Sequence, residues 1–297
     1  MIDILKNTMN VSKTQKKQYI EFIREFRRNP KAVFGLTIVT GLFVLAILAP
    51  EIAPYPIDET NIPIRSRPPS TTHLLGTDQL GRDVFSRVII GTRISLYVGF
   101  TSVAIALTLG TPVGIIAGYY KSLVDEGLMR VMDAFMSFPP ILLALVIVAV
   151  LGPALNNVIY AVAIVYTPYF ARVSRSAAIT ASNEPYVDTA VMRGESDFRI
   201  LFSEILPNCI APVLVQASIN IAFAMLVEAS LSFLGIGAQP PTPSWGLMIN
   251  ESRGFMSQAP WMIFFPGLAI AIAVIGFNML GDGLRDVLDP KVDTIEQ

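Results

Sequence analysis

Long apolar runs with almost no charge are the feature that most limits what this chain can fold into. Residues 33–49 are uncharged and long enough to span, or nearly span, a hydrocarbon core about 30 Å thick. Five more runs follow, at roughly residues 94–118, 132–151, 157–171, 209–233 and 262–280. The sequence therefore predicts an all-α membrane protein with six transmembrane helices.

Composition agrees with this prediction and excludes several kinds of site. Of the 297 residues, 53% are hydrophobic and 15% are charged, whereas about 25% are charged in a typical soluble domain. The net charge of −1 gives no indication of a nucleic-acid partner, and none is expected. The one cysteine, Cys209, excludes an internal disulfide and a multi-cysteine metal site, and the one histidine, His73, excludes a histidine cluster. We therefore expect no metal site and no catalytic centre.

The positions of the lysines and arginines predict the orientation. With the N-terminus in the cytoplasm, sixteen of the 22 basic residues fall on the cytoplasmic side, as the positive-inside rule expects. Five arginines in the loop between the first two runs weaken this bias without reversing it. Both termini are therefore expected in the cytoplasm. The basic residues 1–32 would lie there as a helix along the membrane surface or, over the first dozen residues, as a solvated tail.

Glycines and prolines inside the runs indicate how the helices pack and bend. Gly110, Gly114 and Gly118 lie four residues apart on one face. Small residues at that spacing let two helices approach closely, so we interpret this stripe as a packing surface. Pro139 and Pro140 are expected to kink or interrupt the third span.

Glu228 is a carboxylate placed well inside a predicted span. A charge at that depth costs a few kcal/mol, so the side chain should face protein or water. It would pair with Arg130, line a translocation path or be protonated, and we favour a structural contact between helices. Arg130 and Asp133, near the start of the third span, would otherwise lie at the membrane interface.

A polar island interrupts the apolar pattern at residues 183–208, NEPYVDTAVMRGESDFRILFSEILPN, and we name this segment the elbow. Asn183 as a cap and Pro185 in the first turn are typical of a helix start. Gly194 is typical of the position just after a helix. The first predicted helix would have an apolar face formed by Tyr186, Val187, Ala190 and Val191.

A second short helix is predicted in the other half of the elbow. Ser196 would cap it and Pro207 would end it. Its apolar residues recur at the helical spacing i, i+3, i+4, i+7, and they are Phe198, Leu201, Phe202 and Ile205. Two short helices joined by a hinge on a membrane surface indicate a contact site for a partner.

Motifs that would supply energy are missing from the sequence. The chain has no G-x-x-x-x-G-K-[ST] phosphate loop, so it does not bind ATP in that manner by itself. Nor does a series of Asp, Glu and His residues cross several spans, as a proton relay would need. If the chain moves a solute uphill, the energy has to enter from a partner, and the elbow is where we expect it to enter.

The elbow resembles the EAA loop of binding-protein-dependent ABC importers. Asp188-Thr189-Ala190 stands where that pattern has Glu-Ala-Ala, Gly194 matches its hinge glycine, and ILPN at residues 205–208 matches its closing element. Three other segments resemble the second permease type of dipeptide, oligopeptide and nickel importers. They are HLLGTDQLGRDVFSRVIIGTRISL (73–96), VEASLSFLGIGAQPPTPSWG (227–246) and FPGLAIAIAVIGFNMLGDGLRDVLDP (265–290).

This resemblance implies a type I ABC importer permease in a bacterial or archaeal cell membrane, without enzymatic activity of its own. It would pair with a homologous permease and receive its solute from an extracytoplasmic solute-binding protein. Two ATPase subunits would dock on the elbow and would bind ATP and magnesium, so no cofactor is expected in this chain. Peptides are the favoured solute, with nickel or another small solute as the alternative.

The resemblance also implies a division of the chain and a set of coupling residues. A cytoplasmic segment 1–32 and an N-terminal region 33–92, which holds the first span and an external loop, would precede the main transmembrane domain 93–285. A cytoplasmic tail 286–297 would follow. The residues that couple to the ATPase would be Tyr186, Asp188, Thr189, Ala190, Gly194, Phe198, Phe202, Ile205, Leu206 and Pro207.

Two other classes of function are distinguishable in the sequence. An ion-coupled secondary transporter would need several deeply placed ionisable residues, and Glu228 alone has such a position. A membrane-embedded enzyme would need a metal-ligand or catalytic cluster, which one histidine and one cysteine do not supply.

Overall fold

The computed structural model describes residues 20–288, and the predictions for residues 1–19 and 289–297 lie outside this part. Residues 20–28 are helical, as expected for the basic N-terminal segment. A single antiparallel bridge joins Thr77 and Asp83, and the regular elements between residues 20 and 288 are otherwise helical. The main helices are α2 (Pro30–Ile52), α3 (Val84–Tyr120), α4 (Ser122–Met136), α5 (Pro140–Leu151), α6 (Leu155–Ser182), α7 (Pro185–Met192), α9 (Leu206–Phe233), α10 (Trp245–Ser252) and α11 (Trp261–Leu288).

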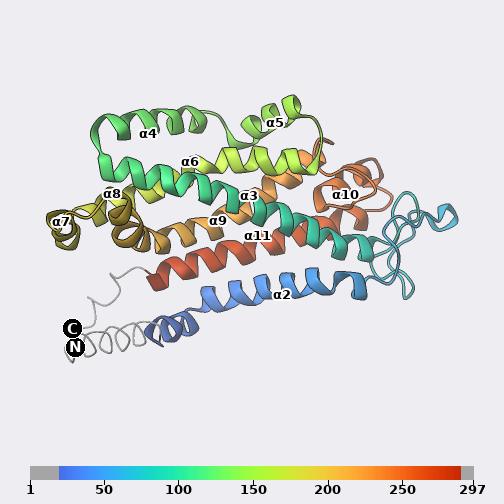
Figure 1. Ribbon diagram of the computed structural model, residues 1–297. Coiled ribbons are helices and arrows are strands. Elements are labelled where there is room, and N and C mark those ends of the chain that lie inside the picture. Colours follow the sequence, from blue (N-terminus) through green and yellow to red (C-terminus); the bar gives the residue numbers. More distant parts are fainter. Residues whose placement is uncertain (1–19, 289–297) are drawn as a thin grey trace.

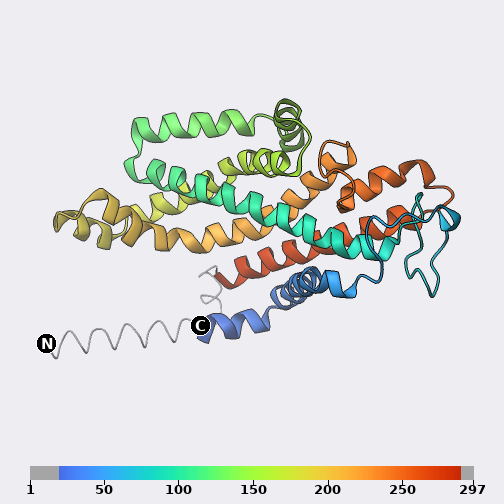
Figure 2. The ribbon, with the colours of Figure 1, turned by 45° about the vertical axis from the view of Figure 1, so that its right-hand side comes forward.

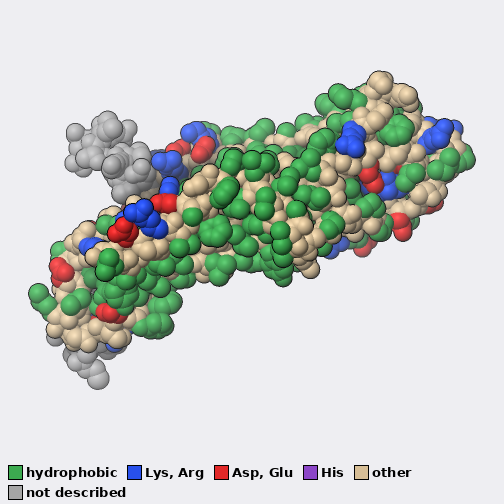
Figure 3. All heavy atoms as spheres, turned by 90° about the horizontal axis from the view of Figure 1, so that it is seen from above, with side chains coloured by type: hydrophobic (Ala, Val, Ile, Leu, Met, Phe, Trp, Pro, Cys, Tyr) green, Lys and Arg blue, Asp and Glu red, His purple; other side chains and the backbone are tan. Residues whose placement is uncertain are grey.

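The bundle has two distinct ends. The elbow, the start of α2 and the end of α11 lie at one end (Figures 1 and 2). Residues 53–83 lie at the other end, together with α10, and we name residues 53–83 the lobe. An ion pair between Lys31 Nζ and Asp286 Oδ2, 3.3 Å apart, joins α2 to α11 at the elbow end. Figure 3 shows hydrophobic side chains over the middle of one face, with charged ones toward both ends, as a membrane-spanning bundle requires.

Between residues 20 and 288, four helices are long and apolar enough to cross a membrane, and a fifth span is formed if α4 and α5 are taken together. The four are α2, α3, α11 and a continuous helix Asp197–Phe233, which includes α9. The fourth predicted span, residues 157–171, lies in α6. This helix packs against α3, α5 and α9, and many of its side chains are buried. A helix surrounded by protein needs less apolar surface than one facing lipid, which explains its weaker hydropathy.

The third predicted span is not one straight helix. α4 ends at Met136 and α5 begins at Pro140, and the two axes are bent by 88°. Pro139 and Pro140 lie at this break, as the sequence predicts. Neither donates a backbone hydrogen bond, and a residue before a proline is disfavoured in helical conformation.

The glycine stripe of α3 packs against α6. A Cβ atom at Gly110 would overlap the carbonyl oxygen of Thr167, and one at Gly114 would overlap that of Ala171. At Gly118 a Cβ would lie 2.7 Å from the carbonyl oxygen of Arg175. The backbones of α3 and α6 therefore approach to a distance that any side chain on this stripe would prevent, which confirms the predicted packing role.

We expect Gly114→Ala to destabilise the protein by about 1–3 kcal/mol, because the added methyl group overpacks the α3–α6 contact. The measurement is the midpoint of thermal unfolding of the purified protein in detergent. Gly127→Ala is the matched control, because it makes the same change in a helix where nothing lies within 4 Å of the new Cβ. Equal midpoints for the two variants would contradict close α3–α6 packing.

Candidate functional site: the elbow

The elbow is a short helix followed by a turn and then by the start of a very long helix. After α7 the chain turns at Gly194 and enters α8 (Asp197–Arg199). A π-helical segment, Ile200–Ile205, continues directly into α9. From Asp197 to Phe233 the chain is one helix of 37 residues. The second half of the elbow is thus part of the fifth predicted span.

The start of α7 differs from the prediction at one residue. Pro185 occupies the first turn as expected, but the N-cap position belongs to Glu184. Asn183, predicted as the cap, is the residue that ends α6. Its side-chain oxygen accepts a hydrogen bond from Lys121 Nζ at 3.0 Å, so it ties the elbow to the end of α3 instead of capping α7.

Gly194 ends α7 in the way that the sequence predicts. Its φ of 73° lies in the left-handed region, which a side chain would strain. The amide of Glu195 then donates to the carbonyl of Ala190 at 3.2 Å, and the amide of Gly194 donates to Val191 at 2.9 Å. These bonds satisfy carbonyls at the end of α7 and fix the direction in which the chain leaves it.

Pro207 does not end the second helix, which corrects the prediction. A proline inside an α-helix removes one backbone bond, and its ring meets the carbonyl four residues earlier. Here the preceding turn is π-helical, with the amide of Leu206 donating to the carbonyl of Leu201. The wider turn accommodates the ring, so the helix passes through Pro207 into the membrane span.

Some of the predicted coupling residues are buried inside the elbow. Ala190 and Ile205 belong to a small core that also contains Val187, Ile200 and Cys209. The floor of this core is formed by side chains of α3 and α6, namely Ile115, Ala178 and Ala181. Leu206 is half-buried against it. These residues fix the shape of the elbow and are not available to a partner.

Other apolar side chains of the elbow point to the outside. Phe198 is 70% exposed and Phe202 is 53% exposed, and their ring centroids lie 4.5 Å apart. Val191 is 53% exposed and Met192, which the sequence analysis did not single out, is 87% exposed. Asp188, Thr189, Gly194, Pro207 and Tyr186 are also exposed. Exposed apolar patches of this kind mark interaction sites.

Hydrogen bonds hold the second half of the elbow against the end of α3. The hydroxyls of Tyr119 and Tyr120 both donate to the carboxylate of Asp197, at 3.1 Å and 2.9 Å. Local sequence patterns do not reveal these tethers, because the tyrosines are 77 and 78 positions away from Asp197 in the chain.

A second contact joins the two halves of the elbow. Asn208 Nδ2 donates to the hydroxyl of Tyr186 at 2.9 Å. Partial desolvation and the nearby carboxylates of Glu184 and Glu204 raise the pKa of Tyr186. This hydrogen bond fixes the position of α7, at the start of the elbow, relative to α9 at its end.

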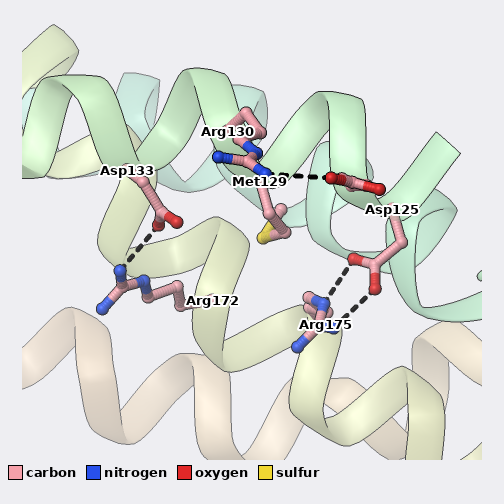
Figure 4. A pocket seen from close by; sticks show the side chains of 7 residues that line it. Asp125, Met129, Arg130, Asp133, Arg172 and Arg175 are labelled. Atoms are coloured by element: carbon pink, nitrogen blue, oxygen red, sulfur yellow. Dashed lines mark hydrogen bonds and ion pairs between the residues drawn. The ribbon is translucent and has the colours of Figure 1, made fainter. Parts of the chain in front are cut away.

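Arg130 and Asp133 lie in a hollow of about 610 Å³ between α4 and α6 (Figure 4). Arg130 pairs with Glu126 at 3.0 Å, and Asp133 pairs with Arg172 at 2.7 Å. These pairs are exposed at the elbow end, in agreement with the interface interpretation. Arg175 binds Asp125 with two bonds of 2.5 Å. Cross-helix pairs of this kind hold α4 against α6.

Glu228 does not pair with Arg130, because it lies five residues before the end of α9, near the lobe. Its side chain is fully buried and accepts a hydrogen bond from Ser232 at 2.7 Å and one from Ser95 of α3 at 3.5 Å. The favoured interpretation of Glu228, a contact between helices, agrees with this geometry.

Residues 110–294, which include the whole elbow, match the family described as binding-protein-dependent transport system inner membrane component. The chain belongs to this family. Residues 17–69 of the permease match a second family, the N-terminal transmembrane domain of oligopeptide transport permease C.

Curated relatives of the permease cover nearly its whole length. It is 46% identical to the dipeptide transport system permease protein of Alkalihalophilus pseudofirmus, over 92% of this chain and 90% of the relative. The dipeptide transport permease of Haemophilus influenzae is 43% identical, over 92% and 94%. A glutathione transport system permease of Escherichia coli is 46% identical, over 92% and 90%.

Solved structures extend this comparison to the fold. An inward-facing structure of the MetNI methionine ABC transporter matches with a TM-score of 0.57 at 17% identity, over 68% of this chain and 97% of that one. At this identity the likeness shows the fold alone. The permease thus has the fold of an ABC importer permease.

Proposed function

We propose that this permease forms half of a translocation path for short peptides and is driven by ATPase subunits docked on the elbow. It would pair with a homologous permease and receive its solute from an extracytoplasmic binding protein. The observation that carries the ATPase contact is the exposure of the apolar side chains of Met192, Phe198 and Phe202 on a segment that has its own buried core. A partner that binds these side chains contacts preformed helices and not an irregular loop.

The same geometry supports a mechanism for coupling. Because Asp197–Phe233 is one helix, a force applied at Phe198 acts on the membrane span without passing through a joint. The tyrosine tethers to Asp197 make the end of α3 move with it. Closure of an ATPase dimer would therefore move the elbow, α9 and α3 as a largely rigid unit.

We expect Phe198→Asp and Phe202→Asp to abolish solute-stimulated ATP hydrolysis by the reconstituted transporter. A charge in an apolar contact of this kind costs at least about 2 kcal/mol, because buried aromatic anchors dominate such interfaces. Co-purification of the ATPase subunits measures docking directly, and the amount of permease in the membrane measures insertion.

Phe198→Leu is the matched control for the elbow experiment, because it keeps the patch apolar and should retain most of the stimulation. Normal stimulation and normal co-purification in both Asp variants would refute the elbow as the ATPase contact.

We also propose six spans, with α4 and α5 as one broken span and α6 as another, and with both termini in the cytoplasm. Cysteine labelling tests this, because Cys209 is buried and can be replaced by alanine. Exposed Met256, near α10, should react as Met256→Cys with a membrane-impermeant maleimide added outside intact cells. Met192→Cys in the elbow, expressed without the ATPase subunits that would cover it, should react only after permeabilisation. The reverse pattern would overturn the proposed orientation.

The peptide substrate is supported by the relatives, whose names specify dipeptides and, at the same identity, glutathione. All of these are short chains of amino-acid residues. We expect the cognate binding protein, purified under native conditions, to release di- or tripeptide-sized ligands that mass spectrometry identifies. Release of a metal ion or a non-peptide solute would contradict this assignment and leave the permease role intact.

A further inference from the structure

The short helix α10 is wedged between α3 and α9 near the lobe. A Cβ atom at Gly246 would overlap the carbonyl oxygen of Ala229 in α9. On the other side, the indole of Trp245 is buried, and its Nε1 donates to the carbonyl of Val88 in α3 at 3.0 Å. The first turn of α10 therefore cannot shift relative to one of these helices without displacing the other.

Glu228 lies where the same three elements meet. Its carboxylate accepts a hydrogen bond from Ser232 in α9 and one from Ser95 in α3, and it lies near Ser244, the residue that caps α10. Ser232 Oγ in turn accepts from the amide of Ala238, in the segment that connects α9 to α10. A buried carboxyl is costly inside a membrane protein, so a position that retains one is a candidate for a functional role.

Ion pairs join the other end of α10 to the lobe and to the start of α3. One carboxylate oxygen of Glu251 accepts from Arg82 and from Arg87, both at 2.9 Å. Both arginines are almost fully buried. Arg82 also pairs with Asp78 at 2.6 Å, and Arg87 donates to the carbonyl of Ile57 at 3.0 Å. A displacement of Glu251 therefore has to displace the lobe or leave Asp78 alone to balance the charge of two buried arginines.

We infer that α10 is a relay between the elbow and the lobe, with Glu228 and Glu251 as the positioning residues at its two ends. The inference rests on the proposed docking of ATPase subunits at the elbow. Motion of the long helix displaces Ala229 and Glu228, α10 follows, and Glu251 carries the displacement to the lobe. Because coupling between two sites is reciprocal, a binding protein seated on the lobe changes the elbow by the same route.

The test uses the complete transporter in proteoliposomes and measures how much ATP hydrolysis rises when the cognate binding protein, as purified, is added. Glu228→Met removes the hydrogen bonds at similar size, and Glu251→Ala removes the carboxylate that joins α10 to the two arginines. We expect each change to reduce the stimulation at least about fivefold while basal hydrolysis and bound ATPase remain. Glu228→Gln keeps the size and one acceptor oxygen, and a serine hydroxyl can accept from its amide group, so this variant should restore most of the stimulation.

A double variant tests whether both residues act on one route. Glu228→Met combined with Glu251→Ala should reduce the stimulation no further than the stronger single change, because the route is already broken. Glu126→Ala, which removes a carboxylate of the exposed ion pair on α4, is the control and should stimulate normally.

Normal stimulation in Glu228→Met would overturn the relay and leave the elbow contact intact, and so would multiplied losses in the double variant. Loss of bound ATPase in the elbow variants tests the proposed function separately, because the relay variants should retain these subunits. Failure of the unmodified transporter to respond to its binding protein would overturn both.

Discussion

The close backbone contact of α3 with α6 is the constraint on which the rest of the structure depends. The contact exists because Gly110, Gly114 and Gly118 carry no side chain, and it brings Ile115 of α3 beside Ala178 and Ala181 of α6. These three side chains form the floor of the elbow core. The elbow is therefore rigid because a glycine stripe in the membrane positions two helices correctly below it.

Rigidity at the elbow has consequences along the whole of α9. A π-helical turn lets the helix pass through Pro207, so the exposed second half of the elbow and the membrane span form one continuous helix. At its far end the same helix carries Glu228, in the junction with α3 and α10. In the proposed mechanism, function is organised along one helix, with apolar side chains exposed at one end and a buried polar junction at the other.

Most of the architecture was predictable from local patterns. The apolar runs predicted the spans, the spacing of the glycines predicted a helix contact, and Gly194 predicted the end of α7 because its conformation favours glycine. Predictions failed where the folded structure satisfied or accommodated a residue in a way that its sequence neighbours do not reveal. Asn183 has the residue type of a cap, but Lys121 binds its side chain. Pro207 has the residue type of a helix end, but the preceding turn widens.

The sequence by itself determined the membrane class, the family resemblance and the position of the elbow, because hydrophobic runs and turn residues act over a few neighbouring positions. Only the tertiary structure decided which elbow residues face outward. Phe198 and Ile205 share one predicted apolar face, yet one is exposed and the other buried, because α3 and α6 cover only part of that face. Tertiary structure likewise decided the partners of Glu228, since Ser95 lies 133 positions away in the chain.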